Sequence, residues 1–154
     1  MTSETKAAIQ SEADQRAVQA GCWFDPKAAA HVVQFFSQFL RHSKGQWAGQ
    51  PFELLDWQRD DVMVPLFGWK REDGRRRFRE AFIAIPKKNG KSTICGGLSL
   101  YGLMADGEPG AEVYGAGSDR EQAGIVYREA AAMVKAAPAL ASRLTLVESR
   151  KRIV

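Results

Sequence analysis

The stretch that decides the fold is Ala81–Thr93, AFIAIPKKNGKST, in which five apolar residues lead through a proline to Gly90-Lys91-Ser92. An apolar run followed at once by Gly-Lys-Ser predicts a buried strand that ends near Ile85 and enters a phosphate-binding loop at the start of a helix. In such a loop, backbone N–H groups and the positive end of the helix dipole face the phosphates. The alternative is an ordinary strand-to-helix turn with solvated lysines, because Gly-Lys-Ser alone is short enough to occur by chance.

The loop residues carry the predicted chemistry. We expect Lys91 to reach the β and γ phosphates of a nucleotide, and Ser92 to ligate magnesium through its hydroxyl. The general pattern has a glycine five positions before the second one, where this chain has Ile85. The predicted nucleotide contacts within the loop are Lys88, Asn89, Gly90, Lys91, Ser92 and Thr93.

Length and composition indicate one globular domain. A chain of 154 residues buries about two-thirds of the surface of its unfolded form. The hydrophobic fraction of 45% and the charged fraction of 26% are ordinary for a folded protein. A formal net charge of +4 is compatible with nucleic acid or phosphate ligands without requiring them. Cys22 and Cys95 are too few for a metal site and favour reduced cytosolic thiols over a disulfide.

The N-terminal segment is predicted to be helical and is not expected to be a secretory signal. Met1–Ala20 is polar and lacks the apolar core of a secretory signal, and no run in the chain is long enough to span a membrane. We expect residues 1–24 to form a polar tail or a loose helix and residues 25–154 to hold the domain. Asp25-Pro26 predicts a helix start. Apolar residues follow at helical spacing: Val32, Phe35, Phe36, Phe39 and Leu40.

Two features before the loop have both a functional and a structural interpretation. In Leu54–Gln58, LLDWQ, Asp56 is expected to cap a short helix that Pro65 ends or kinks. The pair Trp57-Gln58 suits an adenine, because a glutamine amide offers a donor and an acceptor to the base edge. The alternative is an amphipathic helix with a tryptophan in its core face.

The second feature is Trp69–Arg79, which carries six basic side chains around an Asp73-Gly74 turn. Asp-Gly between two arms predicts a hairpin. Its exposed arginines would contact DNA phosphates or a neighbouring subunit, and a solvated hairpin tip is the alternative. The residues predicted to make this contact are Arg75, Arg76 and Arg77.

Beyond the loop, the pattern alternates between helix and strand. Ser92–Met104 predicts a helix with small residues for close packing on a sheet, and Ala111–Gly117 predicts a second strand. Ser118–Glu121 is a capping box for a helix that ends before a proline, and Leu144–Val147 predicts a third strand. This order predicts an α/β fold in which helices flank a parallel sheet, preceded by a helical N-terminal segment.

With these pieces in order, the sequence from about Phe52 to Val154 resembles the N-terminal ATPase part of a tailed-phage terminase large subunit. The resemblance rests on LLDWQRD, FREAFIAIPKKNGKST and DGEPGAEVYGAGSDREQAGIVYREAAAMV. It implies a partial P-loop NTPase core, with ATP and Mg²⁺ as ligands and Trp57 and Gln58 as adenine contacts. It also implies double-stranded DNA, the terminase small subunit and the portal as partners, a homo-oligomeric ring at full length, and a place in the host cell cytoplasm rather than a membrane.

The resemblance explains why Ile85 departs from the general phosphate-loop pattern, but Lys87 departs from the pattern of the family itself. The phosphate loop of this family lacks the first glycine, which accounts for Ile85. Lys87 stands where the family usually has an arginine that contacts the γ-phosphate, and a lysine supplies the charge without the planar bidentate fork. We expect Lys87 and Lys91 to be the catalytic cations. Arg120, Arg128 and Arg143 are equivalent candidates for an arginine that acts on a neighbouring subunit.

No apolar strand ending in paired acidic residues follows the loop. The Walker B aspartate, the catalytic glutamate and the family's nuclease domain are therefore expected to be absent, and the chain is expected to be a fragment that is inactive alone. Two rival readings stay open. One is another P-loop motor such as a helicase, and the other is a non-catalytic DNA-binding or assembly module with a vestigial loop.

Overall fold

The computed structural model describes all 154 residues, which form two compact units. The first unit comprises Met1–Gln34 and Leu54–Ile83, and the second comprises Phe35–Glu53 and Ala84–Val154. Helix α3 (Pro26–Phe39) contributes residues to both. No helix combines the length and the apolar composition that a membrane span needs.

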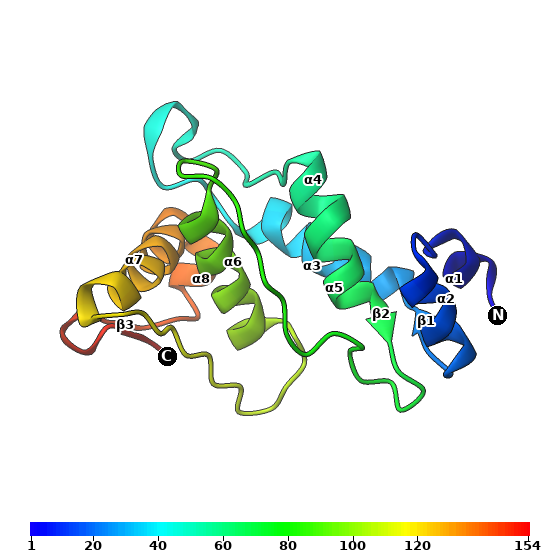
Figure 1. Ribbon diagram of the computed structural model, residues 1–154. Helices are drawn as coiled ribbons and strands as arrows, with labels where there is room; N and C mark the ends of the chain where they lie inside the picture. The colour runs from blue at the N-terminus through cyan, green and yellow to red at the C-terminus, as the bar shows by residue number, and fades with distance from the viewer. The chain divides into compact units, whose positions relative to one another are not determined.

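The first unit consists of short helices and a small antiparallel ribbon (Figure 1). The Phe24 and Trp69 rings meet edge to face at 5.7 Å between centroids, and the Asp25 amide donates to the Gly68 carbonyl at 2.8 Å. These contacts hold the two strands of the ribbon together. Besides the start of α3, its elements are α1 (Ser3–Ala7), α2 (Glu12–Gln19), β1 (Trp23–Phe24), α4 (Asp56–Gln58), a π-helical turn (Arg59–Met63), α5 (Val64–Gly68) and β2 (Trp69–Lys70).

Helix α3 begins where the sequence predicts. The Oδ1 atom of Asp25 accepts hydrogen bonds from the amides of Lys27 and Ala28, at 2.9 Å and 3.2 Å, which is the geometry of an N-cap. The apolar face of the helix is buried, with the exception of Phe39, which is 37% exposed.

The helix that follows Leu55 differs from the expectation at its N-cap, and at Pro65 it is distorted rather than ended. Leu55, rather than Asp56, occupies the N-cap, and its amide donates to Oε1 of Gln58 at 3.0 Å. Pro65 does not end the helix, because the turn before it widens into a π-turn and the helix continues to Gly68. A proline has no N–H to donate and its ring clashes with the carbonyl one turn earlier, so a widened turn accommodates it.

In the second unit, α6 and α7 pack side by side (Figure 1). A Cβ at Gly96 would lie 3.0 Å from the Ala130 amide nitrogen, and one at Gly97 would lie 2.6 Å from the Phe36 ring. The small residues of α6 therefore pack against helices. The prediction that they pack on a sheet was wrong. Besides the end of α3, the elements are a 3₁₀ turn (Gly45–Trp47), α6 (Lys91–Met104), α7 (Arg120–Ala136), α8 (Pro138–Ala141), β3 (Leu146–Val147), a 3₁₀ turn (Glu148–Arg150) and β4 (Arg152–Ile153).

The parallel sheet predicted from the sequence is not formed. Residues 81–85 and 111–117 run as coil (Figure 1), and no backbone hydrogen bond joins either segment to a strand. The sheets present are two antiparallel pairs, β1 with β2 and β3 with β4. An apolar run becomes a strand only when a neighbour takes up its backbone N–H and C=O groups. Without one, Phe82 is 94% exposed and Tyr114 is 82% exposed.

Two smaller predictions near the C-terminus need adjustment. Helix α7 is capped by Asp119, one residue after the predicted Ser118, and Oδ1 of Asp119 accepts from the amides of Glu121 and Gln122 at 2.8 Å each. The predicted strand at Leu144–Val147 is present as the shorter β3, which pairs with β4 in a hairpin.

Candidate phosphate-binding loop

Helix α6 starts directly after Gly90, as the sequence predicts. Gly90 is its N-cap and has a left-handed backbone with φ of +74°, which glycine adopts without the steric cost of a Cβ. The Ile94 amide donates to the Gly90 carbonyl at 2.8 Å, and this bond closes the first helical turn. The backbone N–H groups of that turn have no carbonyl partner within the helix, so they are available to an anion.

Lys88 is a second left-handed residue in the loop, with φ of +71°. A non-glycine residue pays a steric cost for this conformation, so its presence indicates that the loop geometry requires it. Alternation between left-handed and right-handed residues turns successive N–H groups toward one side, the arrangement known as an anion nest. The sequence pattern carries no signal for this role of Lys88, because the motif tolerates many residues at that position.

The lysine of the motif is held over the loop by the main chain. Nζ of Lys91 donates a hydrogen bond to the Ile85 carbonyl at 2.8 Å. The side-chain amide nitrogen Nδ2 of Asn89 donates to the carbonyls of Pro86 and Lys87, both at 3.4 Å, and these weak bonds tighten the turn. The position that lacks the usual glycine therefore contributes its carbonyl oxygen, a role that no side-chain pattern reveals.

The residues present fit a polyphosphate. Lys87, Lys88 and Lys91 are all exposed, so three ammonium groups surround a turn whose N–H groups have no partner. The residues offer fewer ligands to magnesium than to a polyphosphate. Ser92 offers one half-buried hydroxyl, and the chain contains no group of three His, Cys, Asp or Glu side chains that could hold a metal ion. The loop therefore supplies phosphate donors and one oxygen ligand.

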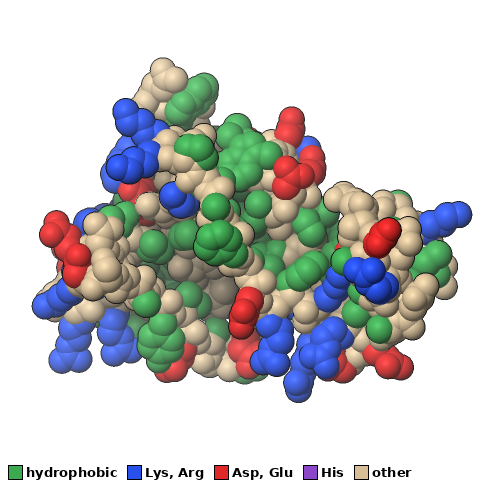
Figure 2. Space-filling view, in the orientation of Figure 1, with side chains coloured by type: hydrophobic (Ala, Val, Ile, Leu, Met, Phe, Trp, Pro, Cys, Tyr) green, Lys and Arg blue, Asp and Glu red, His purple; other side chains and the backbone are tan.

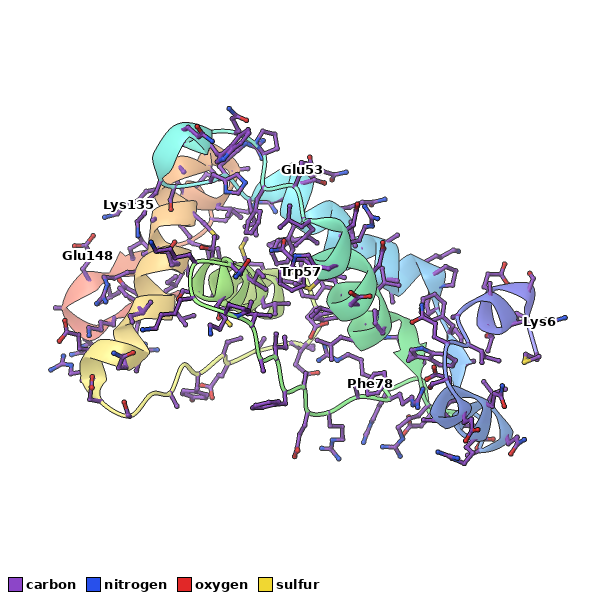
Figure 3. The ribbon with its side chains drawn as sticks, turned by 45° about the horizontal axis from the view of Figure 1, so that its top comes forward. Lys6, Glu53, Trp57, Phe78, Lys135 and Glu148 are labelled. Carbon is purple, nitrogen blue, oxygen red and sulfur yellow. The ribbon has the colours of Figure 1, made fainter.

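Trp57 and Gln58 lie on α4 in the first unit, whereas the loop belongs to the second. Figure 3 labels Trp57 on this helix. Gln58 is 5% exposed, and its Oε1 atom is used by the Leu55 amide, which leaves the amide nitrogen as the group for a base edge. Their role as adenine contacts stays a prediction.

The predicted hairpin at Trp69–Arg79 is formed. The Arg71 amide donates to the Arg75 carbonyl at 2.8 Å, and Gly74 at the turn has φ of +78°. Its arginines are not equivalent, because only Arg75 of the three proposed DNA contacts is exposed. The Arg76 guanidinium lies 5.1 Å from the centre of the Phe67 ring.

Arg77 is half-buried and makes its contacts within the first unit. Its Nη1 atom is 2.6 Å from Oδ1 of Asp14, and the two side chains are only 15% and 13% exposed. Its guanidinium also lies over the rings of Trp69 and Phe78, at 5.1 Å and 4.7 Å from their centres. The prediction of an exposed arginine was wrong here, because the partner carboxylate lies sixty-three positions away and leaves no local signal.

This environment changes the acidity of Asp14. Burial raises the pKa of its carboxyl group, but hydrogen bonds from Arg77, Ser11 and the Gln10 amide act in the opposite direction. The net result is a pKa below the ordinary value of 3.8. Asp14 is therefore ionised in the folded protein and holds the Arg77 charge in place.

Comparisons with known proteins agree on one family. The profile of the family "Terminase large subunit, ATPase domain" matches residues 56–154. The terminase large subunit of Enterobacteria phage HK97 is 27% identical over 124 residues, which are 80% of this chain and 23% of that protein. The crystal structure of the HK97 bacteriophage large terminase matches with a TM-score of 0.60 and 25% identity, over 82% of this chain and 24% of that one. The chain thus spans about a quarter of the length of these relatives.

Proposed function

The chain belongs to the terminase large subunit ATPase domain family, and from this membership we propose that it is the ATP-binding part of a viral DNA-packaging motor. In such a motor, ATP hydrolysis by in-line attack of water on the γ-phosphate is coupled to movement of double-stranded DNA. The observation that carries the proposal is the junction at Gly90, where a left-handed glycine and Lys91 meet the start of α6.

The residues of the loop have separate tasks in this proposal. Lys91 exchanges its bond to the Ile85 carbonyl for the β and γ phosphates, and Lys87 adds a second cation at the transferring group. Lys88, Asn89, Gly90 and Thr93 present backbone N–H groups to the phosphate oxygens. The Ser92 hydroxyl is the ligand for magnesium. When magnesium is bound, it would neutralise the charge that develops on the phosphates.

The remaining parts of the proposal concern regions outside the loop. Trp57 and Gln58 contact the adenine. Arg75 is the one exposed residue among the three arginines predicted to contact DNA or a neighbouring subunit. The family resemblance also supports the terminase small subunit and the portal as partners, a homo-oligomeric ring at full length, and action in the host cytoplasm.

The parallel sheet also belongs to this proposal. Residues 81–85 and 111–117 are rich in apolar side chains that stay exposed, so both segments are able to accept strand partners. Because the chain spans only about a quarter of its matched relatives, strands from the rest of such a protein would pair with them. Hydrogen exchange at residues 81–85 should then be slow in a longer protein that contains this sequence and fast in the 154-residue chain.

The experiment that tests the function is calorimetric titration of the chain with ATP, with and without magnesium. Replacement of Lys91 by alanine should weaken binding by roughly tenfold to a hundredfold, the equivalent of one charge-assisted hydrogen bond. The control is Lys27→Ala, which removes an exposed lysine from the first unit. A vestigial loop predicts no magnesium-dependent binding in any of the three proteins, and that result would contradict the proposal.

A further inference from the structure

The second unit carries a group of basic side chains to which the proposed function gives no task. This basic strip runs along one side of α7 and onto the hairpin of β3 and β4. Figure 2 shows Lys and Arg side chains gathered over the hairpin end of this unit. Its members are Arg120, Arg128, Arg150, Lys151 and Arg152, of which all but Lys151 are exposed.

Two cations of the strip converge over Gly124 of α7. A side chain that began at Gly124 would lie 2.5 Å from Nζ of Lys151 and 3.1 Å from Nη1 of Arg128. Both cationic groups therefore share the space that the glycine leaves open. Like charges this close repel each other, and a bound anion would relieve the repulsion.

The hairpin turn places Lys151 in that position. Leu146 pairs with Ile153 and Val147 with Arg152, so residues 148–151 form the turn. Lys151 adopts a left-handed backbone with φ of +51°, and its Nζ atom donates to the Arg120 carbonyl at 3.0 Å. The turn thereby joins the hairpin cations to those of α7 in one surface.

The acidic residues nearby form no ion pair with the strip. Glu148 pairs with Lys135 at 2.6 Å, and Figure 3 shows both labelled side chains on the same side of the unit. Asp119 accepts the capping hydrogen bonds of α7, Glu112 accepts one from the Tyr114 hydroxyl, and Glu121 is also exposed. No ion pair in the structure includes a member of the strip.

We infer that the basic strip contacts the phosphate backbone of duplex DNA. Arg120 and Arg128 are separated by two turns of helix, roughly 12 Å along its axis, and DNA advances by roughly 3.4 Å per base pair. The row is therefore long enough to meet several phosphates, whereas a single small anion would use only one part of it. This inference rests on the proposed function, which makes DNA a partner, and adds a contact surface outside the 69–79 hairpin.

The test is binding of a fluorescent 30-base-pair duplex to the full chain over a series of salt concentrations. Arg150→Ala with Arg152→Ala should lower the slope of log K against log salt by about two, because each lost phosphate contact removes about 0.9. Lys151→Gly suits the left-handed turn while it removes one cation, so it should lower the slope by about one. The matched control is Lys6→Ala with Lys27→Ala, which removes the same charge from exposed positions of the first unit.

The inference is overturned if the strip variants keep the slope of the unmodified chain, if the control lowers it equally, or if the unmodified chain does not bind the duplex at low salt. The proposed function is judged separately by magnesium-dependent ATP affinity, which the strip variants should retain and Lys91→Ala should lose. If the unmodified chain does not bind ATP but the strip variants still lower the salt slope, the motor assignment is contradicted and the DNA-contact surface is supported. Competition by ATP for the strip, without duplex binding, would identify a small-anion site instead.

Discussion

The Nζ atom of Lys91 lies 2.8 Å from the carbonyl oxygen of Ile85, six positions earlier in the chain. This bond holds the ammonium group against the main chain of the loop. A phosphate that takes over the lysine replaces a neutral carbonyl with a charged acceptor, and hydrogen bonds to charged groups are the stronger ones. Under the proposed function, a phosphate would therefore compete well with this carbonyl for the lysine.

The left-handed backbone of Lys88 makes a prediction about stability. Lys88→Gly should be more stable than Lys88→Ala by about 1 kcal/mol, because glycine alone adopts a φ of +71° without a steric cost. Both variants lose the same charge, so urea denaturation isolates the backbone effect. At Lys87, which has no positive φ, the order should reverse through the larger entropy of glycine in the unfolded chain. Equal stabilities at position 88 would show that the loop relaxes to another conformation.

The contact of Gly97 with Phe36 and Leu40 predicts a packing defect. A Cβ there would lie 2.6 Å from the Phe36 ring and 2.9 Å from Cδ1 of Leu40, both buried side chains. Gly97→Ala should destabilise the chain by about 1–3 kcal/mol in urea denaturation. The control is Gly115→Ala, because the nearest atom to its Cβ would be 3.8 Å away. A Gly97→Ala variant as stable as this control would contradict the observed packing.

Alanine substitutions of Arg77 and Arg75 remove the same charge but should differ in their effect on the free energy of unfolding. Removal of Arg77 leaves the half-buried carboxylate of Asp14 without its partner, and a group left unsatisfied in this way costs about 1–3 kcal/mol. Arg75 is exposed, so Arg75→Ala should change the free energy of unfolding by less than about 0.5 kcal/mol. The free energies of unfolding of the two variants are compared by thermal or urea denaturation. Similar small effects would mean that the Arg77 pair contributes little.

The lowered pKa of Asp14 predicts how stability depends on pH. Because the folded value lies below the unfolded value of 3.8, the ionised group stabilises the fold at neutral pH. That contribution should fall as the pH drops below 3.8 and through the folded pKa. The difference in unfolding free energy between the unmodified chain and Asp14→Asn should therefore be largest near neutral pH and shrink in acid. A difference that does not change with pH would assign the effect to packing.

Turnover gives a final prediction. Lys91 and Ser92 suit phosphates and magnesium, whereas the sequence identifies no carboxylate to orient the attacking water. General-base assistance is typically worth a factor of roughly 10² to 10⁴, so phosphate release by the 154-residue chain should stay near the level of Lys91→Ala. Rapid magnesium-dependent release that disappears in that variant would show that an acidic residue of this chain completes the site.

The sequence by itself determined the features that depend on neighbours a few positions apart. The cap at Asp25, the turn at Gly74 and the helix start at Gly90 each need one residue type and local hydrogen bonds, so pattern reasoning located them. The same locality explains why α6 and α7 were predicted well, although the cap of α7 lies one residue later than expected.

The tertiary structure decided the features that depend on distant partners. Arg77 looks like its neighbours in sequence, and only the fold brings Asp14 to it. Lys151 and Arg128 share the space over Gly124 because a hairpin returns to α7. Residues 81–85 have the composition of a buried strand, yet a strand requires a partner for its backbone groups, and composition does not supply one.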